Sequence, residues 1–127
     1  MIINGPNLNM LGKREPEIYG RERLDDIIEG LRKNFPNVTI DHFQSNHEGE
    51  LVDKLQSLIG GTIDGVVVNF AALSHYSYSL FDALNMLYIP KIEVHISHVY
   101  QREEFRHKSV TVPACNGIIA GLGTYGY

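Results

Sequence analysis

Apolar residues occur along this chain with two different spacings, and their alternation predicts strands separated by helices. Short apolar, β-branched or alternating runs, typical of strands, occur at 1–4, 38–42, 66–68, 91–96 and 117–120. Apolar residues recurring every three or four positions, typical of amphipathic helices, occur at 21–34, 45–59 and 76–87, and a shorter helical turn is expected at 101–107. This order predicts an α/β fold with a doubly wound parallel sheet.

Helix-breaking and capping residues separate these segments. Pro36 ends the first helical pattern, and Gly60-Gly61 ends the second. Ser45 and Glu48 have the spacing of a capping box at a helix start. No repeat or linker interrupts the pattern, so we expect a single domain over residues 1–127. A doubly wound sheet usually carries a helix after its last strand, and we expect that C-terminal helix to be missing.

The composition narrows the class of protein. The chain has 127 residues, of which 43% are hydrophobic and 20% charged, as in globular domains. Its net charge of −4 and its scattered basic residues disfavour nucleic acid and anionic membranes as partners. No apolar run is long enough for a bilayer, no secretory signal pattern is present, and the single Cys115 cannot form an internal disulfide. We therefore expect a cytoplasmic protein.

The most informative polar cluster follows the first predicted strand. The segment from Asn4 to Gly20 contains Asn7, Arg14 and Tyr19 and few apolar side chains. Ligands of open α/β sheets bind at the carboxyl ends of the strands, where this segment lies. An arginine beside a tyrosine favours the phenolate, which can act as a base. A mobile surface loop with a Gly-Pro turn is the structural alternative.

Two further clusters follow later strands. Asn69 ends the third strand, and Ser74 or His75 is expected at the next helix start, where backbone N–H groups bind anions. Helix capping alone is the alternative. Glu93 and His95 face the same side of a strand, so the carboxylate can orient a proton-donating histidine. Such a pair can also be purely structural.

The last cluster contains two arginines. Arg102 and Arg106 are four residues apart and share a face if this turn is helical, where they would bind hydroxyls or a carboxylate; a solvated charged turn is the alternative. His95 and His98 have a zinc-ligand spacing, but with one cysteine and no companion cluster we expect no metal. We expect all the clusters to meet at one edge of the sheet.

These residues resemble the type II 3-dehydroquinate dehydratases, the small dehydroquinases of the shikimate pathway. The resemblance covers nearly the whole chain and rests on motifs at 4–20, 44–51, 74–77, 92–97, 102–106 and 121–127. It implies a flavodoxin-like three-layer fold with a five-stranded parallel sheet. It also implies a cofactor-free anti elimination of water, which converts 3-dehydroquinate to 3-dehydroshikimate through an enolate.

The resemblance implies catalytic roles for five residues. Tyr19 would be the base, and Arg14 would stabilise its phenolate. Asn7 would stabilise the enolate through a bound water. His95 would protonate the leaving hydroxyl, with Glu93 orienting the imidazole.

The remaining implied roles concern substrate binding and assembly. The residues expected to hold the substrate are Asn69, His75, Ile96, Ser97 and Arg106. Asp82 would reach the site of a neighbouring subunit, because the family assembles trimers into homododecamers. Arg102 is assigned only to ion pairing in the loop or at an interface.

Competing interpretations rest on the departures from the family pattern and on the fold. Phe70 stands where the family usually has proline or a small residue, so the substrate loop is open to a different placement. The alternatives are a binding module of the same fold, a receiver domain and an inactive remnant. The Tyr19–Arg14 and Glu93–His95 pairs argue against a binder. Asparagines instead of acidic residues at the strand ends argue against a receiver.

Overall fold

The centre of the molecule is a parallel sheet. The computed structural model describes residues 1–13 and 15–127, and within them five parallel strands pair in the order β2-β1-β3-β4-β5. Their bounds are β1 Ile2–Asn4, β2 His42–Gln44, β3 Val66–Asn69, β4 Lys91–His95 and β5 Gly117–Ala120. This is the flavodoxin-like order, and its direction reverses between β1 and β3. The predicted α/β class and parallel sheet are confirmed.

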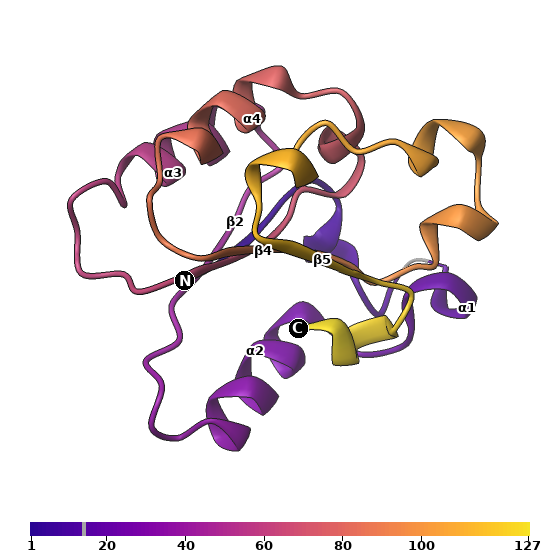
Figure 1. The fold of residues 1–127 in the computed structure, drawn as a ribbon. Helices are drawn as coiled ribbons and strands as arrows, with labels where there is room; N and C mark the ends of the chain where they lie inside the picture. Colours follow the sequence, from indigo (N-terminus) through magenta and orange to yellow (C-terminus); the bar gives the residue numbers. More distant parts are fainter. Residues whose placement is uncertain (14) are drawn as a thin grey trace.

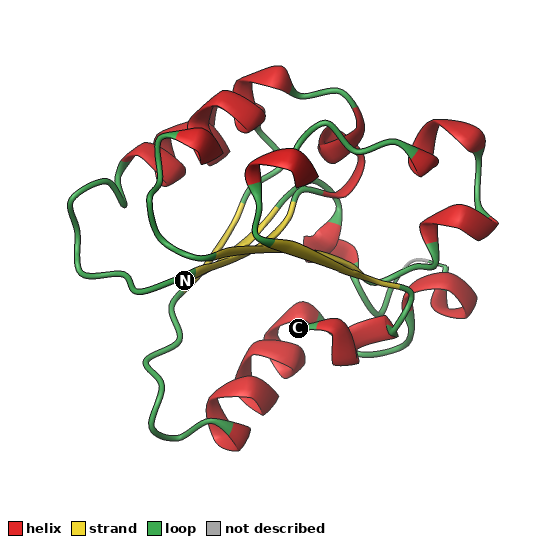
Figure 2. Ribbon diagram, in the orientation of Figure 1, coloured by secondary structure: helices red, strands yellow, loops and turns green. Residues whose placement is uncertain are grey.

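Helices cover both faces of the sheet and make three layers (Figures 1 and 2). The α-helices of the described residues are α1 Pro16–Tyr19, α2 Leu24–Asn34, α3 Glu48–Gln56 and α4 Tyr78–Asn85. Figure 1 shows α3 and α4 on one face, with α2 on the other. After β5 the described residues form the 3₁₀ turn Gly123–Gly126, on the same face as α2. Among all the residues that the structure describes, no helix is both long and apolar enough to cross a membrane.

Alternating residues of the strands belong to two hydrophobic cores, one on each face of the sheet. Ile3 and Val68 pack with Leu51, Leu55 and Leu80 of α3 and α4. On the opposite face, the neighbouring strand residues Ile2 and Val67 pack with the apolar stripe of α2, which consists of Leu24, Ile27, Ile28 and Leu31. The period of two along each strand therefore divides its side chains between the two helical layers.

The second strand begins later than its alternating pattern predicts. Val38 lies in a turn, where its N–H donates to the Phe35 carbonyl at 3.0 Å and its side chain is 57% exposed. Pairing starts with Ile2 of β1 opposite His42, so the residues before His42 have no β1 residue opposite them. The prediction of a strand over 38–42 is therefore wrong except at His42, because the length of the partner strand sets where the ladder begins.

The helix starts also differ from the expected caps. Ser45 and Glu48 do not form a capping box; the Ser45 hydroxyl accepts from the His47 N–H at 2.9 Å, and helix α3 begins at Glu48. The cap of α4 is Ser77, whose hydroxyl accepts from Leu80 N–H at 3.1 Å. Neither Ser74 nor His75 starts that helix, because 71–75 forms a separate 3₁₀ turn. The expected turn at 101–107 is two 3₁₀ turns, Val99–Gln101 and Glu104–His107.

A close backbone approach holds the loops after β1 and β3 together. The Gly5 N–H donates to the Asn69 carbonyl at 2.8 Å. A Cβ atom added at Gly5 would lie 2.7 Å from the carbonyl oxygen of Phe70, closer than atoms can pack. The Phe70 side chain is fully buried, so the backbone at Phe70 has little room to move. Only glycine fits at position 5 without shifting one of these loops.

We expect Gly5→Ala to lower the free energy of unfolding by about 1–3 kcal/mol, because the new methyl group meets fixed backbone. The matched control is Gly30→Ala in α2, where an added Cβ has nothing within 4 Å. That change should raise the free energy by about 0.5–1 kcal/mol through helix propensity. Denaturant unfolding measures both. A Gly5→Ala variant as stable as the wild type would contradict the packing constraint.

Candidate active site

A cleft of about 620 Å³ opens at the carboxyl ends of β1, β3 and β4. Eight of the residues predicted from the sequence line it, namely Asn7, Tyr19, Asn69, His75, His95, Ile96, Ser97 and Arg106. The strand ends therefore bring together side chains up to about a hundred positions apart in sequence, as the parallel topology requires.

Tyr19 lies at the end of α1, and a guanidinium group contacts its hydroxyl. Arg102 Nη1 donates to the Tyr19 oxygen at 2.8 Å and to the Ser97 hydroxyl at 3.1 Å. The Arg102 carbon Cζ also lies 5.3 Å from the centre of the Tyr19 ring. Arg102 pairs with Glu103 at 3.6 Å, as expected for a loop ion pair. Its contact with Tyr19 is a role that the sequence analysis missed, because it joins residues 83 positions apart.

Arg14, the cation that the sequence assigned to Tyr19, lies outside the described residues. The contact from Arg102 places a positive charge beside the phenol independently of Arg14. The described site therefore contains a tyrosine whose hydroxyl is bonded to a guanidinium group.

A buried acid–base pair forms the opposite part of the site. His95 Nε2 donates to Glu93 Oε1 at 2.7 Å, and the Glu93 side chain is fully buried. The Thr111 hydroxyl donates to Glu93 Oε2, and the Ser109 hydroxyl lies 3.1 Å from Glu93 Oε1. A buried carboxylate needs such partners to remain charged. The predicted Glu93–His95 pair is confirmed as a contact, and the hydroxyls behind it were missed.

His75 stacks against His95 at the cleft wall. The ring centres are 5.9 Å apart and the planes differ by 20°. His75 Nδ1 donates to the Lys108 carbonyl at 2.8 Å. Burial, with smaller contributions from His95 and Arg106, lowers the pKa of His75 below its ordinary 6.5, although this hydrogen bond and Glu93 act in the opposite direction. At neutral pH His75 is therefore uncharged and can exchange hydrogen bonds with a polar ligand.

Backbone and side-chain amides order the loops around the cleft. Asn7 adopts a left-handed conformation with φ 68°, which asparagine tolerates better than most residues. Its N–H donates to Asn46 Oδ1 at 2.9 Å, and Gln44 Nε2 donates to the same oxygen at 3.2 Å. Gln44 Nε2 also donates to the Gly5 carbonyl. The loop after β2 thus holds the loop that carries Asn7.

The charges of the cleft favour an anionic ligand. Arg102 and Arg106 line it, and among the described residues no aspartate or glutamate does. Arg106 Nε donates to Glu103 at 2.7 Å, which lowers the pKa of that carboxyl and keeps it ionised. Ile96 and Ser97 follow β4 at the same edge. This arrangement suits a small molecule with a carboxylate and several hydroxyls.

Three remaining features of the sequence are Asp82, the possible metal ligands and Cys115. Asp82 is exposed on α4 and does not line the cleft of its own chain. Within the described residues, no group of three or more histidine, cysteine, aspartate or glutamate side chains could hold a metal ion. Burial raises the pKa of Cys115 to about 12, so this cysteine remains a thiol at neutral pH and does not supply a nucleophile.

Comparisons with known proteins agree with the fold. Residues 1–127 match the family described as dehydroquinase class II. The 3-dehydroquinate dehydratase of Chlorobaculum tepidum is 52% identical over 128 residues, an alignment that covers 100% of this chain and 86% of the relative. That of Thermotoga petrophila is 50% identical over 131 residues and covers 100% and 88%.

Solved structures give the same result. The type II dehydroquinase from Butyrivibrio crossotus superposes with a TM-score of 0.96 at 50% identity, covering 99% of this chain and 89% of that one. The type II dehydroquinase from Propionibacterium acnes superposes with a TM-score of 0.93 at 41% identity, covering 99% and 88%. Matches in sequence and in structure span this chain from end to end, and it belongs to the class II dehydroquinase family.

Proposed function

We propose that this chain is a 3-dehydroquinate dehydratase, a hydro-lyase that removes water from 3-dehydroquinate to give 3-dehydroshikimate. The observation that carries the proposal is one cleft containing a tyrosine contacted by Arg102 and a histidine paired with a buried carboxylate. Its relatives are named for this activity. We place the reaction in the shikimate pathway of aromatic amino acid biosynthesis, in the cytoplasm, in one domain over 1–127.

The first step of the proposed reaction removes a proton. Tyr19, as a phenolate, takes it from the carbon next to the substrate ketone, and the electron pair of the C–H bond forms an enolate. The Arg102 guanidinium, 2.8 Å from the phenol oxygen, stabilises the ionised base. Arg14, in the same segment as Tyr19, would add a second cation. Asn7, through a bound water, stabilises the enolate oxygen.

The second step expels the hydroxyl group. The enolate electrons form the new carbon–carbon double bond as the carbon–oxygen bond breaks, and His95 gives its proton to the departing oxygen. One water leaves. The carbon that loses the proton is formally oxidised by as much as the carbon that loses the hydroxyl is reduced, so the reaction requires no redox partner and we assign no cofactor. Glu93 orients the imidazole and stabilises its protonated form through the bond at 2.7 Å.

The other polar groups of the cleft orient the ring. The substrate carboxylate meets the Ile96 and Ser97 backbone and the Ser97 hydroxyl. His75 and Arg106 contact ring hydroxyls, which fits the uncharged state of His75. Asn69 holds the substrate near its leaving hydroxyl. Holding the ring by both ends aligns base and acid on opposite faces, as an anti elimination needs.

Turnover of 3-dehydroquinate, followed by the ultraviolet absorbance of the conjugated enone product, tests the function. We expect the wild type to form product with a chelator present and Tyr19→Phe to lose at least about 10²-fold in kcat, because the base is gone. Tyr76→Phe, at an exposed tyrosine outside the cleft, is the matched control. Substrate binding without turnover by the folded wild type would instead identify a binding module.

The support behind His95 gives a second test. Thr111→Val removes the hydroxyl that donates to Glu93 Oε2 and leaves a buried charge short of a partner. We expect kcat to fall about tenfold and the free energy of unfolding to drop by about 1–3 kcal/mol. Thr111→Ser keeps the hydroxyl and should retain most of both. Equal losses in the valine and serine variants would show that the hydroxyl does not support the acid.

We further propose a homo-oligomer, a dodecamer built from trimers, in which Asp82 reaches the cleft of a neighbouring subunit. Asp82 is exposed on α4, and the nearby Tyr78 and Tyr88 are 67% and 98% exposed, which is typical of an interface.

Asp82→Asn should lower kcat/KM about tenfold without changing the assembly, because one interaction with the neighbouring site is lost. Asp53→Asn, at an exposed carboxylate of α3, should not lower it. Sedimentation and steady-state kinetics measure the two properties. A stable monomer with full activity would refute the role of Asp82 across subunits.

A further inference from the structure

A chain of hydrogen bonds runs beneath the cleft and joins residues from four parts of the sequence. Asn4 and Asn69 lie opposite each other on β1 and β3, and both side chains are buried. The hydroxyl of Tyr127 lies between them: it donates to Asn4 Oδ1 and accepts from Asn69 Nδ2 at 2.9 Å. Beyond Asn4, the amide Nδ2 is 3.2 Å from His42 Nε2.

The donors and acceptors of this chain point in one direction. At the cleft end, the backbone N–H of Ala71, which can only donate, bonds to Asn69 Oδ1 at 3.2 Å. Asn69 must then offer Nδ2 to Tyr127, and the Tyr127 proton must point to Asn4 Oδ1. Asn4 is left with Nδ2 for His42, whose Nε2 must be free of a proton. One fixed backbone donor thus sets the orientation of both buried amides.

The state of each end agrees with this direction. Burial raises the pKa of Tyr127, so its hydroxyl keeps the proton that it donates. Burial lowers the pKa of His42 below its ordinary 6.5, so the neutral imidazole that can accept is the prevailing form at neutral pH. Among the described residues, no buried side-chain nitrogen or oxygen lacks a partner. Each link therefore has a donor facing an acceptor.

The amide at the cleft end is the one that faces a ligand. Asn69 lines the cleft, as does Ala71, whose φ of 52° is strained for a residue with a side chain. The side-chain oxygen Oδ1 of Asn69 accepts from the Ala71 N–H, and one of the two protons on its Nδ2 is donated to Tyr127. Its second amide proton remains for a ligand oxygen. If the Asn69 side-chain amide flipped, its NH₂ group would face the Ala71 N–H, and the hydrogen bonds with Ala71 and Tyr127 would both be lost.

We propose that Tyr127 is a positioning residue of the active site, whose hydroxyl fixes the orientation of the Asn69 amide so that it donates to a hydroxyl or carboxylate oxygen of the substrate. The inference rests on the proposed function for the identity of the substrate. It goes beyond that function by assigning a role to a residue that does not reach the reacting atoms, and by making His42 the proton-sensitive end of the chain.

The sign of the pH effect follows from the bonding. A proton on His42 Nε2 would face the Asn4 amide protons, and relieving that clash requires Asn4 to turn over. Asn4 would then no longer accept the Tyr127 proton. Acidification through the lowered pKa of His42 should therefore loosen Asn69 and weaken substrate binding.

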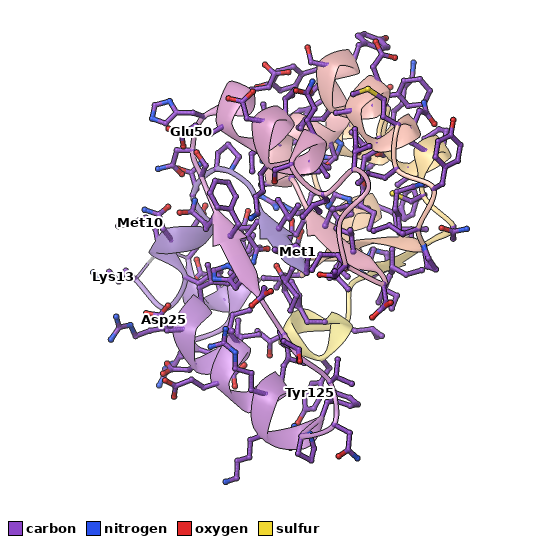
Figure 3. The ribbon with its side chains drawn as sticks, turned by 90° about the vertical axis from the view of Figure 1, so that its left-hand side faces the viewer. Met1, Met10, Lys13, Asp25, Glu50 and Tyr125 are labelled. Carbon is purple, nitrogen blue, oxygen red and sulfur yellow. The ribbon has the colours of Figure 1, made fainter. Side chains whose placement is uncertain are left out.

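Other charges act on His42 from the elements packed around it. Asp25 of α2 raises the pKa of His42 and Arg32 of α2 lowers it, both less than burial does. Lys13 and Arg23 line the same surface hollow as His42 and Asp25. In Figure 3, Met10 and Lys13 project from the loop after β1 between Glu50 of α3 and Asp25 of α2.

The first experiment removes the single hydroxyl. For Tyr127→Phe we expect KM for 3-dehydroquinate to rise about tenfold with kcat changed less than about threefold, the pattern of a lost orienting contact. Tyr125→Phe is the matched control, because Tyr125 is two residues away on the same C-terminal turn and 96% exposed (Figure 3). Its kinetics should equal those of the wild type.

Nuclear magnetic resonance of the ligand-free protein provides a readout independent of catalysis. The two Nδ2 protons of Asn69 should have separate, exchange-protected signals in the wild type and in Tyr125→Phe, and should lose that protection in Tyr127→Phe. If the wild type did not turn over 3-dehydroquinate, the proposed function would fail while this measurement still tested the hydrogen-bond chain. Unchanged Asn69 signals and KM in Tyr127→Phe would overturn the inference.

A second variant tests the other end if Tyr127→Phe does not fold. His42→Gln keeps an acceptor oxygen for Asn4 but cannot be protonated in this range. We expect the wild-type KM to rise several-fold more than that of His42→Gln between about pH 7 and pH 5.5, below the ordinary histidine pKa. An equal rise in both proteins would refute the coupling between His42 and the cleft.

Discussion

The buried charge of Glu93 is the constraint on which the arrangement of the cleft depends. A carboxylate without exposure is costly unless donors surround it, and here the donors come from His95 on the same strand and from Ser109 and Thr111 of the loop before β5. The hydrogen bonds that stabilise this charge therefore also fix the imidazole of the proposed acid, His95, and the path of that loop. The same loop carries the Lys108 carbonyl that holds His75 beside His95.

The two halves of the proposed chemistry are supported in different ways. The proposed base, Tyr19, is exposed enough to line the cleft and depends on a long, flexible arginine from another segment. The proposed acid is held by short side chains in the rigid interior. An acid held by several short side chains gives a bound ring one fixed direction of proton transfer against which to be aligned.

Local patterns predicted those parts of the fold that depend on local residues. The β-branched run at 66–68 and the apolar stripe of 24–31 predicted a buried strand and a helix, because burial acts on every residue of such a segment. The start of β2 depends on the partner strand, and the caps of α3 and α4 on hydroxyls that have several candidate partners within a few residues. Neither is encoded in a short window.

The cleft shows the same division. Parallel topology and the resemblance to a family were enough to gather Asn7, Tyr19, Asn69 and His95 at one edge. Arg102, Thr111 and Tyr127 were missed in their supporting roles, because each acts through a contact with a residue distant in sequence. The resemblance named a motif at the C-terminal end, but only the fold brings its tyrosine between two asparagines.

The contact of Tyr127 with Asn4 also bears on the order in which the molecule forms. It joins residues 123 positions apart, and contacts between residues so distant in sequence tend to form after local ones, because the chain between them must first be brought together. The sheet and the core beneath α3 and α4 do not include Tyr127, so they can assemble before this contact exists, whereas the core beneath α2 is completed by Tyr127. The contacts of Tyr127 that orient Asn69 beneath the cleft would then be among the last native contacts to form.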